Sequence, residues 1–233
     1  MSGENLSKRL HFECLPSTQD FVKERRIDGV DLVVTAAEQT GGKGTKGRSF
    51  SSERGGVYLS KLTFYETFPA KKAFLIMASA AVAVCETLRF YGVKPYIKWA
   101  NDVWVNDKKI CGILTENVFS GEWVRSSAVG IGLNVCNRLP NELSGIATTM
   151  QRVTGREFSV EEVTNRLIEE LYKERTIEEY QAYIGYMGRQ ATLLLGDERI
   201  HGTLLFVDDE GGLHVEINGE NRRLTAAEVS IRM

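Results

Sequence analysis

Residues 39–48 read QTGGKGTKGR, and this stretch decides between two kinds of fold. Gly42, Gly44 and Gly47 match the GxGxxG spacing of dinucleotide-binding proteins. That fingerprint requires a strand before the loop and a helix after it, because the helix N-terminus binds the pyrophosphate. Here a β-rich run, residues 31–38, precedes the loop, but the next regular segment, residues 57–64, also has the pattern of a strand. A strand–loop–strand order argues against the dinucleotide-binding fold.

The same loop has the chemistry of an anion site. Its four glycines allow the backbone N–H groups to approach a ligand closely. Lys43, Lys46 and Arg48 add three positive charges in six residues, although the chain as a whole has 29 basic and 31 acidic side chains. Phosphate binding is the favoured interpretation, and a solvated flexible loop is the alternative. The net charge of -2 predicts no nucleic-acid partner.

Two further strings carry weaker signals of a site. In residues 98–102, KWAND, Lys98 lies beside Trp99 and is expected to be partly desolvated, so that its ammonium needs an anionic partner. The alternative is a surface lysine whose stem lies along the sheet. In residues 129–135, VGIGLNV, Gly130 and Gly132 interrupt a strand, which indicates a bulge or a ligand against the backbone.

The remaining pattern predicts an α+β protein with a mixed central sheet and two domains. Apolar periodicity and caps predict helices at residues 16–26, 70–91 and 159–186, and strands at residues 95–99, 103–105, 109–119 and 122–135. From residue 188 the chain shows only short alternating segments, at residues 191–195, 200–207, 213–217 and 222–224. We therefore expect a main domain, residues 1–187, and a small β-barrel, residues 188–233.

Composition narrows the class of protein. The chain is 42% apolar and 26% charged, as in ordinary globular proteins. Its longest uncharged stretch, residues 73–85, is short of the roughly 20 residues that span a bilayer, so we expect a buried helix and no membrane association. The four cysteines form no CxxC pair and the three histidines are widely separated, which argues against a zinc site and predicts reduced thiols in a cytoplasmic protein.

Taken together, five strings in order resemble the bacterial biotin protein ligases. They are STQ (17–19), QTGGKGTKGR (39–48), KWAND (98–102), GILTE (112–116) and GIGLN (130–134), where that family usually has STN, QxxGRGRRGR, KWPND, GILxE and GIGIN. The resemblance covers about residues 10–233 and implies a class II synthetase-like catalytic domain followed by an SH3-like domain. Only sixteen residues precede Ser17, so we expect the short form, without the DNA-binding domain.

The resemblance implies a two-step reaction with ATP, biotin and Mg²⁺. Biotin would be activated as biotinyl-5′-AMP and transferred to a lysine of a biotin carboxyl carrier protein domain. Lys98 and Arg48 would be catalytic. The implied biotin-binding residues are Ser17, Thr18, Gln19, Gln39, Lys43, Gly44, Thr45, Lys98, Gly112, Gly130 and Gly132. The implied ATP- and adenylate-binding residues are Gly42, Lys43, Gly44, Thr45, Lys46, Arg48, Asn101 and Asn134, with Asp102 and Asn101 as partners of Mg²⁺.

The chain departs from the family's usual motifs at four positions. Thr45 replaces an arginine in the glycine-rich loop, which predicts weaker retention of the adenylate. Gln19 stands for asparagine and Ala100 for proline, and both changes keep the polar groups of the motifs. Phe50 stands for tryptophan, which matters little if the residue serves only as an apolar wall.

Two other functions remain open at this stage. A lipoate or octanoate ligase or transferase would use a related fold, but an acyl chain without a ureido ring would leave the polar groups of residues 17–19 and Gln39 without partners. A non-catalytic binding module is the second alternative, although Phe206 is the only aromatic residue of the predicted barrel. An exposed edge strand of the central sheet could pair two subunits into a homodimer.

Overall fold

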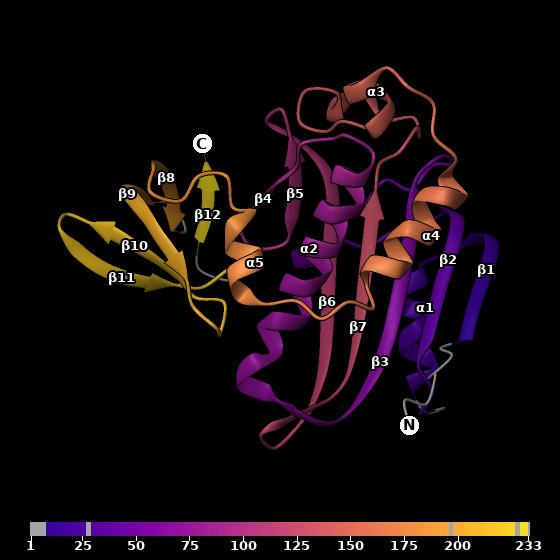
Figure 1. Cartoon of the computed structure of the whole chain (residues 1–233), viewed down its shortest axis with the longest axis horizontal. Helices are drawn as coiled ribbons and strands as arrows, with labels where there is room; N and C mark the ends of the chain where they lie inside the picture. Colours follow the sequence, from indigo (N-terminus) through magenta and orange to yellow (C-terminus); the bar gives the residue numbers. More distant parts are fainter. Residues whose placement is uncertain (1–7, 27–28, 196–197, 227–228, 233) are drawn as a thin grey trace.

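The computed structural model describes residues 8–26, 29–195, 198–226 and 229–232, and consists of two β-sheets with helices around the larger one (Figure 1). The larger sheet has the strand order β1-β2-β3-β7-β6-β5-β4. Its strands are β1 (Lys8–Leu15), β2 (Leu32–Gln39), β3 (Val57–Pro69), β4 (Tyr96–Lys98), β5 (Asp102–Val105), β6 (Lys108–Ser120) and β7 (Trp123–Leu133). Strands β1 and β2 are parallel and the other neighbours are antiparallel, so the predicted mixed sheet and α+β class are confirmed.

Local chemistry explains the connections of this sheet. Asn106 and Asp107 both have positive φ, 48° and 59°, which suits a tight two-residue turn between β5 and β6. Helix α1 (Thr18–Glu24) connects β1 to β2, and the Ser17 hydroxyl caps it by accepting a hydrogen bond from the Asp20 N–H at 3.2 Å.

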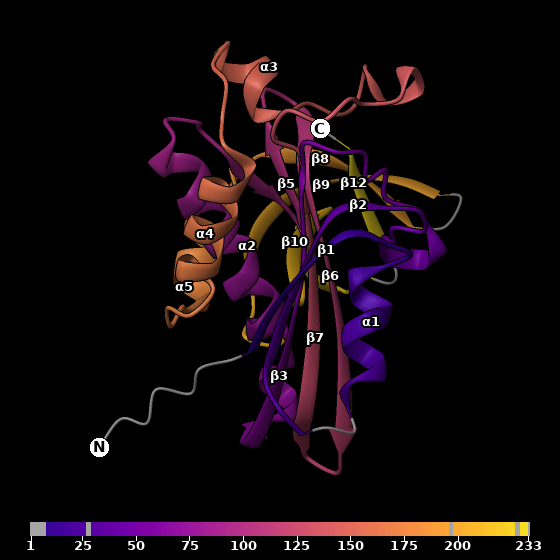
Figure 2. The same ribbon diagram turned by 90° about the vertical axis from the view of Figure 1, so that its right-hand side faces the viewer.

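Helices cover the two faces of the sheet unequally (Figure 2). On one face, α2 (Ala73–Phe90), α4 (Val160–Glu170) and α5 (Ile177–Ala182) enclose the main apolar core. On the other, α1 covers a small cluster around Val22 and Leu62. The segment Ala70–Phe90 is long and apolar enough to cross a membrane by those two criteria alone, but most of it is buried within the protein, as expected for a core helix.

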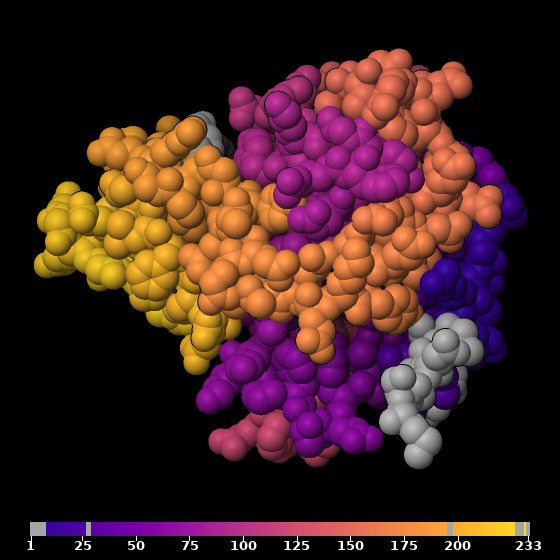
Figure 3. Space-filling view, in the orientation of Figure 1, coloured from indigo at the N-terminus to yellow at the C-terminus, as the bar shows by residue number. Residues whose placement is uncertain are grey.

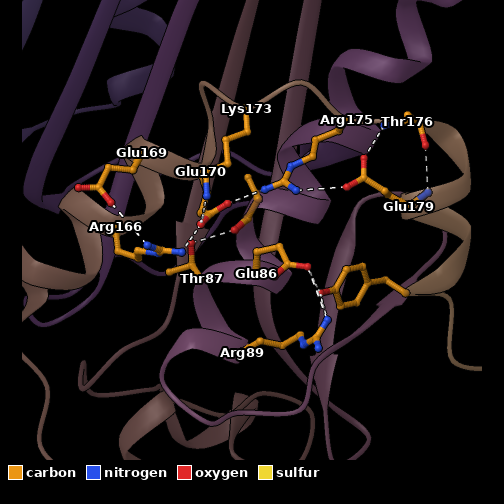
Figure 4. A network of polar contacts seen from close by, with 12 residues as sticks. Glu86, Thr87, Arg89, Arg166, Glu169, Glu170, Lys173, Arg175, Thr176 and Glu179 are labelled. Carbon is orange, nitrogen blue, oxygen red and sulfur yellow. Dashed lines mark hydrogen bonds and ion pairs between the residues drawn. The ribbon is translucent and has the colours of Figure 1, made fainter.

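The single helix predicted for residues 159–186 is wrong. The chain forms two helices, α4 and α5, separated at residues 171–176. Thr176 and Glu179 form a capping box that starts α5. The buried Glu170 accepts hydrogen bonds from Arg166, Lys173 and Arg175, which holds the break in place (Figure 4). The capping box satisfies backbone N–H groups at the start of α5, and the three cations balance the charge of the buried carboxylate.

The second sheet forms from residue 190 onward and has the strand order β11-β10-β9-β8-β12. Its strands are β8 (Gln190–Leu195), β9 (Glu198–Val207), β10 (Leu213–Ile217), β11 (Glu220–Leu224) and β12 (Val229–Arg232). The four predicted segments are confirmed, and β12 was missed, as was β1 in the larger sheet.

The two sheets are in direct contact, and the space-filling view shows them as one continuous surface (Figure 3). The indole N–H of Trp99 donates to the carbonyl of Gly211 at 3.3 Å. Gly211 has φ +87°, and a Cβ there would lie 2.1 Å from the ring of Phe74 on α2. Only glycine therefore allows this turn of the second sheet to approach the large core so closely.

Candidate active site

Strand register brings the separate sequence motifs onto one face of the large sheet. Lys98 of β4 is opposite Asp102 of β5, which is opposite Gly112 of β6. Gly112 is in turn opposite Gly132 of β7, which is opposite Tyr58 of β3. Because residues directly opposite each other point to the same face, this row crosses the sheet on the side covered by α1.

A cavity of about 790 Å³ lies over this row. The glycine-rich loop, the start of α1 and the second sheet form its other walls. The predicted site residues in its lining are Ser17, Thr18, Gln19, Gln39, Lys43, Gly44, Thr45, Lys46, Arg48, Lys98, Asn101, Asp102, Gly112, Gly130, Gly132 and Asn134.

Gly42 does not line this cavity. It lies instead on a groove of about 610 Å³ on the other side of the loop. A Cβ at Gly42 would fall 2.4 Å from the carbonyl oxygen of Phe50. Packing within the loop therefore accounts for this glycine, and its predicted contact with ATP has no support in the lining of the cavity.

A chain of polar groups forms one part of the cavity wall. The Thr18 N–H donates to Gln39 Oε1 at 2.8 Å, and Thr18 Oγ1 lies 3.0 Å from the same oxygen. Thr18 Oγ1 also lies 2.9 Å from Ser60 Oγ, which is 3.1 Å from Gln19 Oε1. Gln39 Nε2 donates to Ser52 Oγ at 2.8 Å. These groups can match a ligand that carries both hydrogen-bond donors and acceptors.

Positive charge is concentrated in the rest of the wall. The ammonium of Lys98 lies 4.1 Å from the ring centroid of Trp104, a cation–π contact. Lys109 Nζ lies 2.6 Å from Asp102 Oδ1. Among the described residues that line the cavity, five are cationic and one, Asp102, is acidic. In a chain of net charge -2, this is a strongly local field suited to an anionic ligand.

The glycine-rich loop is tied to α1 and to itself. Lys43 Nζ lies 2.7 Å from Asp20 Oδ2, and this hydrogen-bonded contact raises the pKa of Lys43. Arg48 donates to the carbonyl and the hydroxyl of Thr45, at 3.2 and 3.0 Å. The loop thus presents its cations at the cavity in a defined conformation.

The glycines of β7 make room for side chains of the protein. A Cβ at Gly132 would lie 2.4 Å from the ring of Phe50, and one at Gly130 would lie 2.7 Å from Gln19 Oε1. Each glycine therefore admits a neighbouring side chain to the cavity wall. The prediction that a ligand lies directly against this backbone stays a prediction.

Among the described residues that line the cavity, Asp102 is the one carboxylate that could bind a divalent cation. Among the residues that the structure describes, no group of three or more His, Cys, Asp or Glu side chains could hold a metal. Asn101 Nδ2 donates to the carbonyl of Ile113 at 2.8 Å, and Asp102 pairs with Lys109. This set suits Mg²⁺ that arrives with phosphate ligands, since such ions use one or two carboxylates and substrate oxygens.

Many residues of the cavity wall were not among those predicted from the sequence, and four of them illustrate why. Ser60 and Lys109 contribute polar groups, and Leu194 and Ile231 of the second sheet contribute apolar surface. Alternation along β3 could have placed Ser60, which is opposite Gly130 in the register. The contribution of β8 and β12 had no signal in the sequence, because it depends on how the two sheets pack.

Comparison with known proteins identifies the family. The model of the biotin/lipoate A/B protein ligase family matches residues 11–134, more than half of the chain. This chain belongs to the biotin/lipoate A/B protein ligase family. The matched region contains all five of the motif strings.

Two relatives and one solved structure illustrate the family likeness. The chain is 31% identical over 242 residues to the bifunctional ligase/repressor BirA of Bacillus subtilis, covering 95% of this chain and 73% of that protein. It is 28% identical to the biotin–[acetyl-CoA-carboxylase] ligase of Mycobacterium tuberculosis, covering 87% and 79%. The biotin protein ligase of Aquifex aeolicus, solved with biotin and ATP, has a TM-score of 0.75 at 28% identity and covers 97% of this chain and 99% of that one.

Proposed function

We propose that this member of the biotin/lipoate ligase family activates biotin with ATP as biotinyl-5′-AMP and transfers the biotinyl group to a lysine of a biotin carboxyl carrier protein domain. The observation that supports this most directly is a single cavity that joins a polar hydrogen-bonding wall to a strongly cationic one. The first suits a cyclic urea and the second suits a carboxylate meeting a triphosphate.

In the first step, a carboxylate oxygen of biotin attacks the α-phosphorus of ATP. The bond between this phosphorus and the β-phosphate oxygen breaks, and pyrophosphate leaves with the electron pair. Both reactants are anions, so the barrier includes their mutual repulsion. The ammonium of Lys98, held against Trp104, would lie between them and stabilise the transition state, and Arg48 would hold phosphate oxygens.

Mg²⁺ would enter with ATP and neutralise phosphate charge. Asp102 and the side-chain oxygen of Asn101 would be its protein partners. Binding there would require Asp102 to share its carboxylate between the cation and Lys109. Asn134, which is buried and lies in the cavity wall, would contact the nucleotide.

In the second step, the neutral amine of the acceptor lysine attacks the acyl carbon of the mixed anhydride. The bond from this carbon to the phosphate oxygen breaks, AMP leaves, and the new amide loses a proton to solvent. This step requires no nucleophile from the enzyme. A carrier domain as acceptor accounts for a chain of near-zero net charge better than a nucleic acid does.

The organisation of the protein forms part of the proposal. We assign residues 1–187 to a catalytic domain and residues 188–233 to an SH3-like domain. The four cysteines are all free thiols, which supports a cytoplasmic location. Strand β1 is at the end of the strand order, and its outer edge would allow two copies to form a homodimer.

The experiment that tests the proposal is mass spectrometry of a biotin carboxyl carrier domain incubated with this protein, biotin and MgATP. We expect one biotinyl group on one lysine. Lipoate and octanoate, offered separately, should give no modification of the carrier domain. Neither compound should stimulate the exchange of labelled pyrophosphate into ATP. Modification by octanoate alone would assign the related acyl transfer, and unchanged modification by a Lys98→Ala variant would contradict the assigned chemistry.

A further inference from the structure

Glu116 of β6 lies beside the cavity wall without forming part of it. In the register it is opposite Ala128 of β7, on the same face as the cavity. Its Oε2 accepts a hydrogen bond from Gln19 Nε2 at 2.8 Å, and its Oε1 accepts one from Lys23 Nζ at 2.7 Å. Any effect of this carboxylate on a ligand would therefore pass through Gln19, which does line the cavity.

The contacts of Glu116 fix the orientation of the Gln19 carboxamide. Gln19 Nε2 has two hydrogens, and it donates one to Glu116 and the other to the carbonyl of Ala128 at 3.0 Å. Gln19 Oε1 must then face Ser60 Oγ. Carboxylate and carbonyl oxygens can only accept hydrogen bonds, so Glu116 and the Ala128 carbonyl together exclude the reversed carboxamide, with its oxygen toward Glu116. Gln19 is almost fully buried, which makes that reversed contact costly.

With Gln19 in this orientation, the polar chain formed by the side chains of Gln39, Thr18, Ser60 and Gln19 has one hydrogen too few for its hydrogen bonds. Three oxygen–oxygen contacts follow one another, from Gln39 Oε1 to Thr18 Oγ1, to Ser60 Oγ and to Gln19 Oε1, at 3.0, 2.9 and 3.1 Å. The hydroxyls of Thr18 and Ser60 supply only two hydrogens for them. Gln39 cannot supply the third, because its Oε1 faces Thr18 and accepts from the Thr18 backbone N–H. Its Nε2 faces away and donates to Ser52 Oγ, whose own hydrogen goes to the carbonyl of Phe50.

We propose that Glu116 is a positioning residue that selects an N–H-bearing head group, because together with the Ala128 carbonyl it keeps both amide hydrogens of Gln19 out of the polar chain. A ligand N–H in the cavity, such as that of a cyclic urea, would donate to Thr18 Oγ1 or Ser60 Oγ and offset the repulsion between these two oxygens, whose hydrogens go to Gln39 and Gln19. An aliphatic or dithiolane acid has no such donor and would leave two oxygens in unfavourable contact. This inference rests on the proposed function and adds a source of its specificity.

The ionisation of Glu116 is consistent with this role. Burial would raise its pKa, but hydrogen bonds from Lys23 and Gln19 and the charge of Arg26 outweigh that effect, so the pKa is lowered. The groups that face this carboxylate from α1 are therefore cationic or neutral donors. It is a carboxylate, and so an obligate acceptor, at neutral pH.

The test compares Glu116→Gln with the wild type in pyrophosphate exchange at varied biotin. The substituted carboxamide can donate to Gln19 Oε1, so that only the Ala128 carbonyl still opposes the reversed orientation, in which Gln19 supplies the third hydrogen itself. We expect KM for biotin to rise at least about tenfold, with KM for ATP and kcat within about twofold, and the preference for biotin over octanoate to fall. Circular dichroism and thermal unfolding would establish that the variant is folded.

Two further variants separate positioning from structural support. Lys23→Met removes the ion pair and leaves the Glu116–Gln19 hydrogen bond, so KM for biotin should change less than about threefold. In a Gln19→Met background, Glu116→Gln should have almost no additional effect, since Glu116 acts through that carboxamide. Additive effects, or an equal loss in Lys23→Met, would overturn the inference.

Failure of this inference is distinguishable from failure of the proposed function. A wild-type protein without biotin-dependent exchange would contradict the function itself. An active wild type together with an unchanged KM for biotin in Glu116→Gln would contradict only the role of Glu116.

Discussion

Two buried or half-buried glutamates, on opposite faces of the large sheet, have the same chemistry and different surroundings. Glu170 is 1% exposed, and its carboxylate accepts hydrogen bonds from Arg166, Lys173 and Arg175 (Figure 4). The side chain of Glu116 is about a third exposed and bonds one ammonium, that of Lys23, and one neutral carboxamide, that of Gln19. The first carboxylate contacts charges of its own helix and the following loop, and the second contacts a side chain of the cavity.

The comparison shows that the role of such a carboxylate depends on what its hydrogen-bond partners contact in turn. The partners of Glu170 lie in α4 and in the loop between α4 and α5, and none of them lines the cavity or the groove described above, so we assign Glu170 to the stability of the helical layer. The partner Gln19 continues through Ser60 and Thr18 into the candidate active site. Four experiments would sharpen or break this distinction.

The largest effect should come from the cationic wall of the cavity. We expect Lys98→Ala to lower kcat/KM for adenylate formation about a thousandfold, because it removes the charge closest to the reacting anions in the proposed mechanism. The free energy of unfolding should change by less than about 1 kcal/mol, since Lys98 lies at the cavity surface. A Lys98→Ala variant with full exchange activity would remove the basis for assigning chemistry to this face.

A substitution in the helical layer should lower stability and leave substrate binding nearly unchanged, the reverse of Lys98→Ala. Glu170→Gln leaves three cations without their carboxylate, and we expect the free energy of unfolding to fall by about 3 kcal/mol in urea denaturation. KM for biotin should stay within twofold at a temperature where the variant is folded. Glu169→Gln, in the same helix but 63% exposed, is the matched control and should be nearly neutral. A large change in KM with unchanged stability would reverse the comparison.

The glycine-rich loop should give an intermediate effect. Thr45→Arg restores the charge that the family usually has at this position, although it also removes the hydroxyl to which Arg48 donates. We expect biotinyl-AMP to dissociate about tenfold more slowly, as one added charge-assisted hydrogen bond predicts. The off-rate can be measured with labelled adenylate in single-turnover experiments. An unchanged rate would show that Thr45 is not what limits retention.

The smallest effect is the pH dependence of stability. Burial raises the pKa of both glutamates, but their hydrogen-bonded cations lower it further, so each folded-state pKa lies below the ordinary value of 4.5. The stability from ionisation is thus present above about pH 4.5 and is lost as the pH falls through the folded pKa. In unfolding series from pH 7 to pH 3, Glu170→Gln should flatten the acid limb more than Glu116→Gln. Equal slopes in all three proteins would contradict this ranking.

The sequence was most informative about the candidate site where a short motif itself contains the polar, charged or glycine residues that line the cavity. The loop at residues 39–48, the run around Lys98 and the glycine pair in β7 predicted four of the five cationic residues of the cavity wall and its two β7 glycines, because each string lies on a strand or at its end. The break after Glu170 was missed, since residues 171–176 have no proline or glycine to mark it. Ser60 and the role of Glu116 require the strand register, which a single sequence does not specify.

The hydrogen bond from the Trp99 indole to the Gly211 carbonyl limits how far this protein can be truncated from its C-terminus. The residue next to Lys98 is anchored to the last fifth of the chain, and Leu194 and Ile231 close the cavity from the same side. A fragment ending near residue 187 would keep every motif string and still lose one wall of its reaction chamber. The minimal enzyme is therefore longer than the stretch that its signature sequences define.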